Sequence, residues 1–186
     1  MLRAASAIIA ACLAAACATA PTGGPPIVPS STDAPFTTDG RLSARRGSEA
    51  ATANFTWRHA PPRDDLVVTT PLGQAVAEIS GDRSTAHYEL RTADGRLEGA
   101  TNWSELTERV LGAPVPVEGL SAWIGGTPRP GAPFSAEQDA AGRASVLRQD
   151  GWEIVYAYAE DDARLPSRLQ LTQGDLEIRI VVLKRH

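Results

Sequence analysis

Few residues in this chain have the types and spacing that chemistry requires. Its only two cysteines, Cys12 and Cys17, lie within the first seventeen of 186 residues, so the rest of the chain can form neither a disulfide nor a cysteine metal site. The three histidines, His59, His87 and His186, include no pair at metal-ligand spacing. The chain contains neither a Gly-x-Ser-x-Gly nucleophile elbow nor a phosphate-binding loop. We therefore expect no metal, no cofactor and no enzymatic activity.

Acidic residues beside turns are the remaining candidates for acid–base chemistry. Asp64 and Asp65 follow a proline pair, and a second acidic run occupies residues 160–162. Such runs beside turns are far more often solvated than paired as catalytic carboxylates. The pattern predicts that both aspartates are solvated turn residues and that His59 and His87 are half-exposed.

The N-terminus has the organisation of an export signal. Arg3 gives a positive start, and residues 4–16 form an uncharged stretch that is shorter than the roughly 20 residues of a membrane span. The segment Leu13-Ala14-Ala15-Ala16-Cys17 resembles a bacterial lipoprotein signal, in which the cysteine is acylated and becomes the first mature residue. We favour Cys17 over Cys12, which would leave an apolar stretch of only eight residues. The alternative is an incidental cysteine in an ordinary cleaved signal.

A flexible tether is expected after the signal. Residues 17–39 are dominated by Pro, Gly, Ser, Thr and Ala, with little apolar periodicity. In the lipoproteins that this N-terminus resembles, an Asp after the acylated cysteine commonly marks retention in the inner membrane. Ala18 stands there instead and implies the outer membrane. We assign residues 1–16 to a signal peptide, 17–39 to a tether and 40–186 to one globular domain.

The charge balance excludes one class of partner. The chain has 18 basic and 22 acidic residues, for a net charge of −4. Loss of the signal removes only Arg3, so 17 basic and 22 acidic residues leave −5. Such a body has no basic surplus with which to bind nucleic acid. Because it would not attract anionic lipid either, membrane attachment would depend on the acyl chains.

Hydrophobic periodicity in the body changes from strand-like to helical and back. Asn102 and Glu105 form a capping-box pattern ahead of a helix that ends at Gly112, and a second short helix is expected over residues 117–124. Residues 127–142 are expected to be loop-rich. The pattern predicts a mainly β fold with some α structure, in which helices lie inside or across the mouth of a strongly curved antiparallel sheet or open, unclosed β-barrel. Alternation predicts about eight to ten short strands, among them residues 51–57, 66–70, 74–80, 85–90, 145–149, 152–158, 169–171 and 176–182.

Large apolar residues on the inward-facing positions would line the interior of such a barrel. Alternation alone does not distinguish a filled core from a cavity, so both remain open. The candidate lining residues are Phe55, Trp57, Leu66, Val68, Trp103, Leu106, Trp123, Ile124, Ile154 and Tyr156.

Several short motifs are spread in order over the body. They are Gly40-Arg41-Leu42-Ser43, Phe55-Thr56-Trp57, residues 66–70 leading into Pro71-Leu72-Gly73, residues 111–116, residues 120–126, Gly151-Trp152-Glu153-Ile154-Val155-Tyr156 and Leu165-Pro166. Together these motifs resemble the LolB family of outer-membrane lipoproteins. The chain departs from that family in lacking an amphipathic helix before Gly40 and a tryptophan near the C-terminus.

The resemblance implies a function in lipoprotein transport. It implies that a lipid-anchored, periplasm-facing protein of a Gram-negative outer membrane accepts acylated lipoprotein cargo from a LolA-like carrier. The acyl chains would bind in an apolar cavity and then be inserted into the inner leaflet of that membrane. It also implies that the Pro71-Leu72-Gly73 loop inserts into outer-membrane lipid during release. We expect a monomer. The alternatives are a membrane-anchored binder of another apolar ligand, a carrier like LolA itself, or a non-catalytic envelope scaffold.

Overall fold

The computed structural model describes residues 26–30 and 34–186. Cys12 and Cys17, with the predicted signal peptide, lie outside the described residues. The described part contains helices α1 (Trp103–Leu111) and α2 (Val117–Trp123). Its strands are β1 (Phe36–Arg46), β2 (Glu49–Ala60), β3 (Arg63–Thr69), β4 (Ala75–Asp82), β5 (His87–Thr92), β6 (Leu97–Ala100), β7 (Phe134–Gln138), β8 (Ala144–Gln149), β9 (Trp152–Ala157), β10 (Arg168–Gln173) and β11 (Leu176–Arg185).

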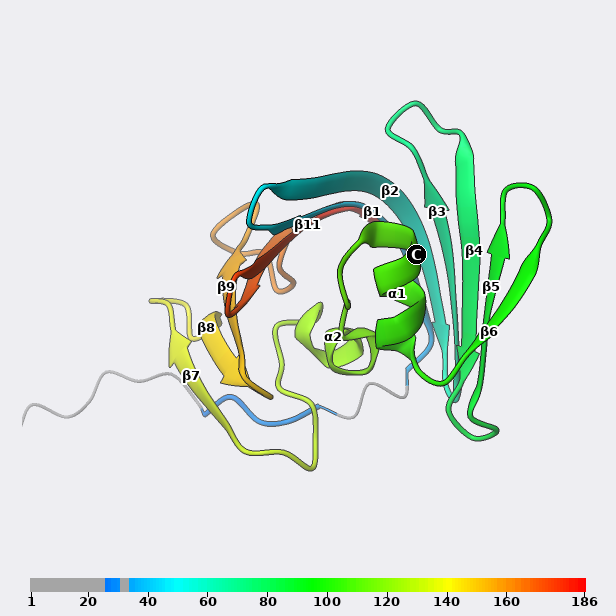
Figure 1. Cartoon of the computed structure of the whole chain (residues 1–186). Coiled ribbons are helices and arrows are strands. Elements are labelled where there is room, and N and C mark those ends of the chain that lie inside the picture. Colours follow the sequence, from blue (N-terminus) through cyan, green and yellow to red (C-terminus); the bar gives the residue numbers. More distant parts are fainter. Residues whose placement is uncertain (1–25, 31–33) are drawn as a thin grey trace, which may run out of the picture.

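All eleven strands form one antiparallel sheet in the order β6-β5-β4-β3-β2-β1-β11-β10-β9-β8-β7. The chain leaves the sheet at one edge after β6, forms both helices, and returns at the opposite edge as β7. Because β6 and β7 are the two edges and do not pair, the barrel is open. Both helices lie within the curve of the sheet (Figure 1). The predicted fold class is therefore confirmed.

The Asn102 cap predicted for the first helix is present, and Glu105 reaches back to the residue before the cap instead of to Asn102 itself. Asn102 Oδ1 accepts a hydrogen bond from the backbone N–H of Glu105 at 3.0 Å, and the Glu105 carboxylate accepts from the N–H of Thr101 at 2.9 Å. Gly112 ends the helix in the left-handed region, with φ of 68°, which glycine adopts without a steric penalty. These caps fix both ends of the short helix that covers β2, β4, β5 and β6.

The first strand was missed, because no strand was expected before residue 51. β1 starts at Phe36, inside the segment assigned to the tether, so the boundary placed at Gly40 is wrong by four residues. Thr38 explains the error, because it is a polar residue that is buried and satisfied by donating to the Lys184 carbonyl at 2.9 Å. A polar residue on an inward-facing position interrupts the alternation that identifies strands.

Two edge strands also escaped prediction. β7 lies within the stretch expected to be loop-rich, and no strand was expected at β6. Both are short and each pairs on one side only, so neither has the long alternation of a central strand. Together with β1, they raise the number of strands from the eight located in the sequence to eleven, above the expected eight to ten.

Residues 26–30 form no helix or strand. Ile27 packs against the core, and the N–H of Ser30 donates to the Pro128 carbonyl at 3.3 Å. Among the residues that the structure describes, no helix is both long and apolar enough to cross a membrane.

Candidate functional site

The concave face of the sheet is apolar because alternate residues of each strand point inward. In β9, for example, Trp152, Ile154 and Tyr156 are buried and the residues between them are exposed. The helices cover this face from the inside, so that sheet and helices share one core. An apolar cavity between them is lined by Leu42, Ala53, Phe55, Trp57, Leu66, Val68, Thr107, Leu111, Val115, Leu120 and Ile180.

Thr107 is the polar member of the cavity lining, and its hydroxyl is fully used. It donates to the Trp103 carbonyl at 3.0 Å and accepts from the N–H of Val115 at 2.7 Å. These bonds join α1 to the segment that leads into α2. The cavity therefore offers apolar surface to a ligand and no free polar side chain of its own.

The ten candidate lining residues are all buried. Four of them, from β2 and β3, line the cavity: Phe55, Trp57, Leu66 and Val68. The other six lie elsewhere in the same core: Trp103 and Leu106 on α1, Trp123 and Ile124 at the end of α2, and Ile154 and Tyr156 on β9.

Sequence reasoning missed the other seven lining residues, which come from β1, β2, β11, both helices and the connection between the helices. Leu42, Leu111 and Leu120 belonged to the motifs that resembled a family, and this was a signal for them. Ala53 and Ile180 lay on predicted strands. Their inward direction was predictable from the alternation, but their distance to the helices was not.

The cavity is much smaller than an acyl chain. Its volume is about 20 Å³, enough for about one water molecule. The interior is filled largely by the fully buried rings of Trp57, Trp103 and Trp123. Of the two possibilities that the sequence left open, a filled core and a cavity, this conformation therefore shows an interior that is almost filled. The helices that cover the curved sheet fill its interior as a core. The alternation in the sequence alone could not exclude this arrangement.

The turn between β3 and β4 presents a single large apolar side chain to solvent. Leu72 is 90% exposed at the tip of a tight turn, in which the N–H of Gly73 donates to the Thr70 carbonyl at 2.8 Å. Gly73 has a φ of 85°, which other residues adopt only with strain. The turn projects at the top of Figure 1, away from both helices. The sequence placed Pro71, Leu72 and Gly73 in one loop, and the structure does the same.

A polar cluster at the β2–β3 turn contradicts the sequence analysis. Asp64 and His59 are each only 1% exposed rather than solvated or half-exposed. Their side chains lie 2.5 Å apart, and Asp64 also accepts from the indole N–H of Trp57 at 2.9 Å. Phe36 stacks on the His59 ring and closes the cluster. Asp64 is buried because Trp57 and His59 satisfy its carboxylate and the guanidinium of Arg83 lies 3.9 Å from it. These contacts come from the fold.

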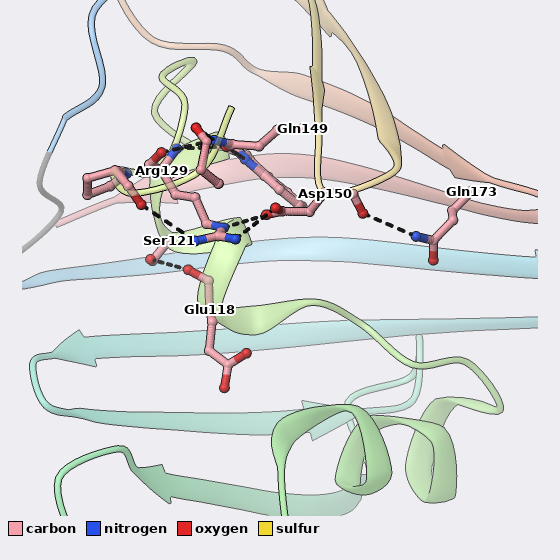
Figure 2. A network of polar contacts seen from close by, with 9 residues as sticks. Glu118, Ser121, Arg129, Gln149, Asp150 and Gln173 are labelled. Carbon is pink, nitrogen blue, oxygen red and sulfur yellow. Dashed lines mark hydrogen bonds and ion pairs between the residues drawn. The ribbon is translucent and has the colours of Figure 1, made fainter. Parts of the chain in front are cut away.

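A second polar network fixes the end of α2 to the sheet, as Figure 2 shows. Gln149 Oε1 accepts from the indole N–H of Trp123 at 2.8 Å and from the N–H of Arg129 at 2.9 Å. Its amide nitrogen donates to the Arg129 carbonyl at 2.9 Å. Arg129 in turn forms a two-pronged ion pair with Asp150, whose carboxylate raises the pKa of Arg129.

An open groove of mixed polarity, with a volume of about 720 Å³, lies between the β4–β5 turn, α2 and the β8–β9 turn. Charged residues of both signs line it, including Arg83, Glu118, Arg129 and Asp150. Its charge makes it a poor site for hydrocarbon. Among the described residues, no three His, Cys, Asp or Glu side chains are grouped so that they could hold a metal ion.

Comparison with known proteins identifies the family of this chain. The family described as outer membrane lipoprotein LolB matches residues 34–184. An outer-membrane lipoprotein LolB of Chromobacterium violaceum is 37% identical over 84% of this chain and 83% of its own length. Another, from an Azoarcus species, is 37% identical over 96% of this chain and 92% of its own length. A crystal structure of a DUF1329 family protein from Desulfovibrio piger shares the fold with a TM-score of 0.52 and 8% identity, over 82% of this chain and 85% of that one. The chain belongs to the LolB family.

Proposed function

We propose that this chain is an outer-membrane lipoprotein that accepts acylated lipoproteins from a LolA-like periplasmic carrier and inserts them into the inner leaflet of the outer membrane. Membership of the LolB family supports the proposal, as do relatives named outer-membrane lipoprotein LolB. The observation that carries it is Leu72, which is 90% exposed on a projecting turn. A large apolar side chain that is exposed to water at the tip of a tight turn is suited to contact with lipid.

Attachment to the membrane is proposed to depend on Cys17. Acylation there, after removal of residues 1–16, would make the protein a lipid-anchored monomer facing the periplasm. Two or more acyl chains bind a membrane firmly, whereas one binds weakly. The chain between Cys17 and Ile27, which packs against the core, would act as the tether. It would let the Leu72 turn reach the membrane from a globular domain that is itself in water.

The cargo requires shelter from water because its acyl chains are large. Three chains of about 15 methylenes each, at about 0.8 kcal/mol per buried methylene, represent roughly 36 kcal/mol of exposure. The inner face of the sheet has the apolar surface to receive them. A cavity of about 20 Å³ does not, so we propose that α1 and α2 move away from the sheet when acyl chains enter.

The Leu72 turn is proposed to act at release. Transfer of a leucine side chain from water into lipid contributes about 1.5–3 kcal/mol, so insertion of the turn would hold the domain against the membrane while the cargo leaves. The turn lies outside the apolar core. Uptake of cargo and its delivery should therefore be separable by mutation.

A reconstituted transfer assay tests the proposal. A triacylated lipoprotein on a LolA-like carrier is offered to the full acylated chain, and incorporation into phospholipid vesicles is then measured. We expect Leu72→Glu to accept cargo normally and to incorporate it at least tenfold more slowly, because the charge opposes insertion.

Leu183→Glu is the matched control. Leu183 is a leucine that is 64% exposed near the end of β11, which lies three strands away from β3 in the sheet. This variant should transfer as the wild type does. Normal incorporation by Leu72→Glu would refute the role of the turn. A wild-type chain that takes up no lipoprotein would refute the whole proposal and favour an envelope scaffold with a filled core.

A further inference from the structure

Two buried side-chain polar atoms have no hydrogen-bond partner within the part of the chain that the structure describes. They are the indole nitrogen of Trp103 and the hydroxyl of Tyr156. A buried tyrosine hydroxyl almost always finds a partner, so each exception needs an explanation. The Trp103 ring is held between Tyr88 and the backbone of Gly81, where an added Cβ would lie only 2.6 Å from it. Close packing of the Trp103 ring therefore accounts for the burial of its nitrogen without a partner.

Tyr156 is placed differently, in line with the apolar cavity. It lies on the inner face of β9 and is 7% exposed. Its neighbour across the ladder is Leu169 of β10, which pairs with Ile180 of β11. Ile180 pairs with Leu42 of β1, and both line the cavity. Since neighbouring strands are about 4.8 Å apart, Tyr156 is roughly 10 Å along this row from the cavity wall.

The Tyr156 hydroxyl adds a free hydrogen-bond donor, which the lining of the cavity lacks. A lipoprotein's acyl chains are attached through ester and amide bonds, and their carbonyl oxygens lose hydrogen bonds to water when the chains enter an apolar interior. A buried hydroxyl donor without a partner can restore one such bond. Burial raises the pKa of Tyr156, so its hydroxyl keeps its proton at any pH at which the protein works.

We propose that the Tyr156 hydroxyl donates a hydrogen bond to the ester or amide carbonyl of an acyl chain whose tail lies along the row toward Ile180 and Leu42. The inference rests on the proposed function and assigns Tyr156 as the polar anchor of the acyl site. It explains why a tyrosine stands on an inward position of β9 where a phenylalanine would satisfy the core.

Tyr158, two residues along the same chain, provides the matched comparison. Its hydroxyl donates to the Ala144 carbonyl at 2.9 Å, and the guanidinium of Arg143 lies 4.0 Å above its ring. The Tyr158 hydroxyl is therefore engaged in the ligand-free protein. Removing it should lower the melting temperature, whereas removing the Tyr156 hydroxyl should not.

The test measures binding of two synthetic lipopeptides to the full chain and to its Tyr156→Phe and Tyr158→Phe variants. One lipopeptide carries two palmitoyl esters on its glyceryl group, and the other carries the same chains as ethers, which lack the carbonyl. We expect Tyr156→Phe to bind the diester about fivefold more weakly than the wild type does, and the diether equally. Tyr158→Phe should bind both as the wild type does.

The possible outcomes distinguish failure of the Tyr156 inference from failure of the proposed function. Equal binding of the diester by Tyr156→Phe and the wild type would overturn the inference and leave the proposed function intact. Equal loss for diester and diether would also overturn it, because the effect would then come from packing. If the wild type bound neither lipopeptide, the proposed function itself would fail, and the inference with it.

Discussion

At one end of β3, the carboxylate of Asp64 is buried against Trp57 and His59; just beyond the other end, the side chain of Leu72 extends into water with 90% of its surface exposed. The usual preference of charged groups for solvent and of apolar groups for the core is thus reversed at both ends of one strand.

The two reversals have different physical consequences. Asp64 is compensated where it lies, because an indole N–H and the His59 ring contact its carboxylate. Nothing compensates Leu72, since a turn tip surrounded by water gives a leucine no apolar neighbour. Because its partners lie within the fold, the buried Asp64 carboxylate stabilises the structure and implies no ligand. The uncompensated reversal at Leu72 implies a partner surface, which is why the proposed function depends on it.

Removal of the buried carboxylate should have the largest effect on stability. Asp64→Ala leaves the Trp57 indole N–H without its acceptor and removes the carboxylate beside His59, so we expect the free energy of unfolding to fall by about 3 kcal/mol. Urea denaturation measures it. Asp65→Ala is the control, because Asp65 pairs with Arg63 near the surface and should change stability by less than 1 kcal/mol. Similar losses in the two variants would contradict a special role for the buried residue.

A smaller loss should follow from removing one donor of the same cluster. Trp57→Phe deletes the hydrogen bond to Asp64 and part of a fully buried ring, for which we expect about 2 kcal/mol. Trp103→Phe deletes a comparable buried ring whose nitrogen has no partner. It should therefore cost less in the same denaturation experiment. If the two variants lost equal stability, the hydrogen bond to Asp64 would contribute nothing.

The fold could be predicted to a large extent because local signals agreed with the tertiary structure. The Asn102 cap and the glycine at position 112 mark the first helix in sequence and in space. What escaped were elements defined by their neighbours. Thr38 is inward because it donates to the carbonyl of Lys184, 146 residues away. The strand β7 exists because β8 pairs with it.

The candidate site was predictable only in part, for a similar reason. Leu72 could be located because a turn between Pro71 and Gly73 exposes whatever lies between them. The burial of His59 and Asp64 could not be predicted, because it depends on contacts between strands: Asp64 bonds to side chains of β2, and Phe36 of β1 stacks on His59. The orphan hydroxyl of Tyr156 was equally invisible, since the absence of a partner is a property of the packed interior and of no local pattern.

Substitution of Leu72, just beyond the end of β3, should leave the free energy of unfolding almost unaffected. Leu72→Glu replaces a side chain that makes no core contact, and exposed substitutions of this kind change the free energy of unfolding by about 0.5 kcal/mol or less. The same urea experiment measures it in the absence of lipid. A loss above 1 kcal/mol would mean that Leu72 is part of the folded core, and the contrast between the two ends of β3 would disappear.

The smallest expected effect is the energetic coupling between Asp64 and Leu72, at the two ends of β3. Asp64 and Leu72 are separated by roughly 25 Å along an extended chain, and no partner is common to both. The stability changes of Asp64→Ala and Leu72→Glu should therefore add in the double variant to within about 0.5 kcal/mol. Asp64→Ala, measured where it is still folded, should also incorporate cargo at the wild-type rate. A coupling above 1 kcal/mol, or slow incorporation by folded Asp64→Ala, would show that the buried cluster controls the exposed turn and that the two ends act as one unit.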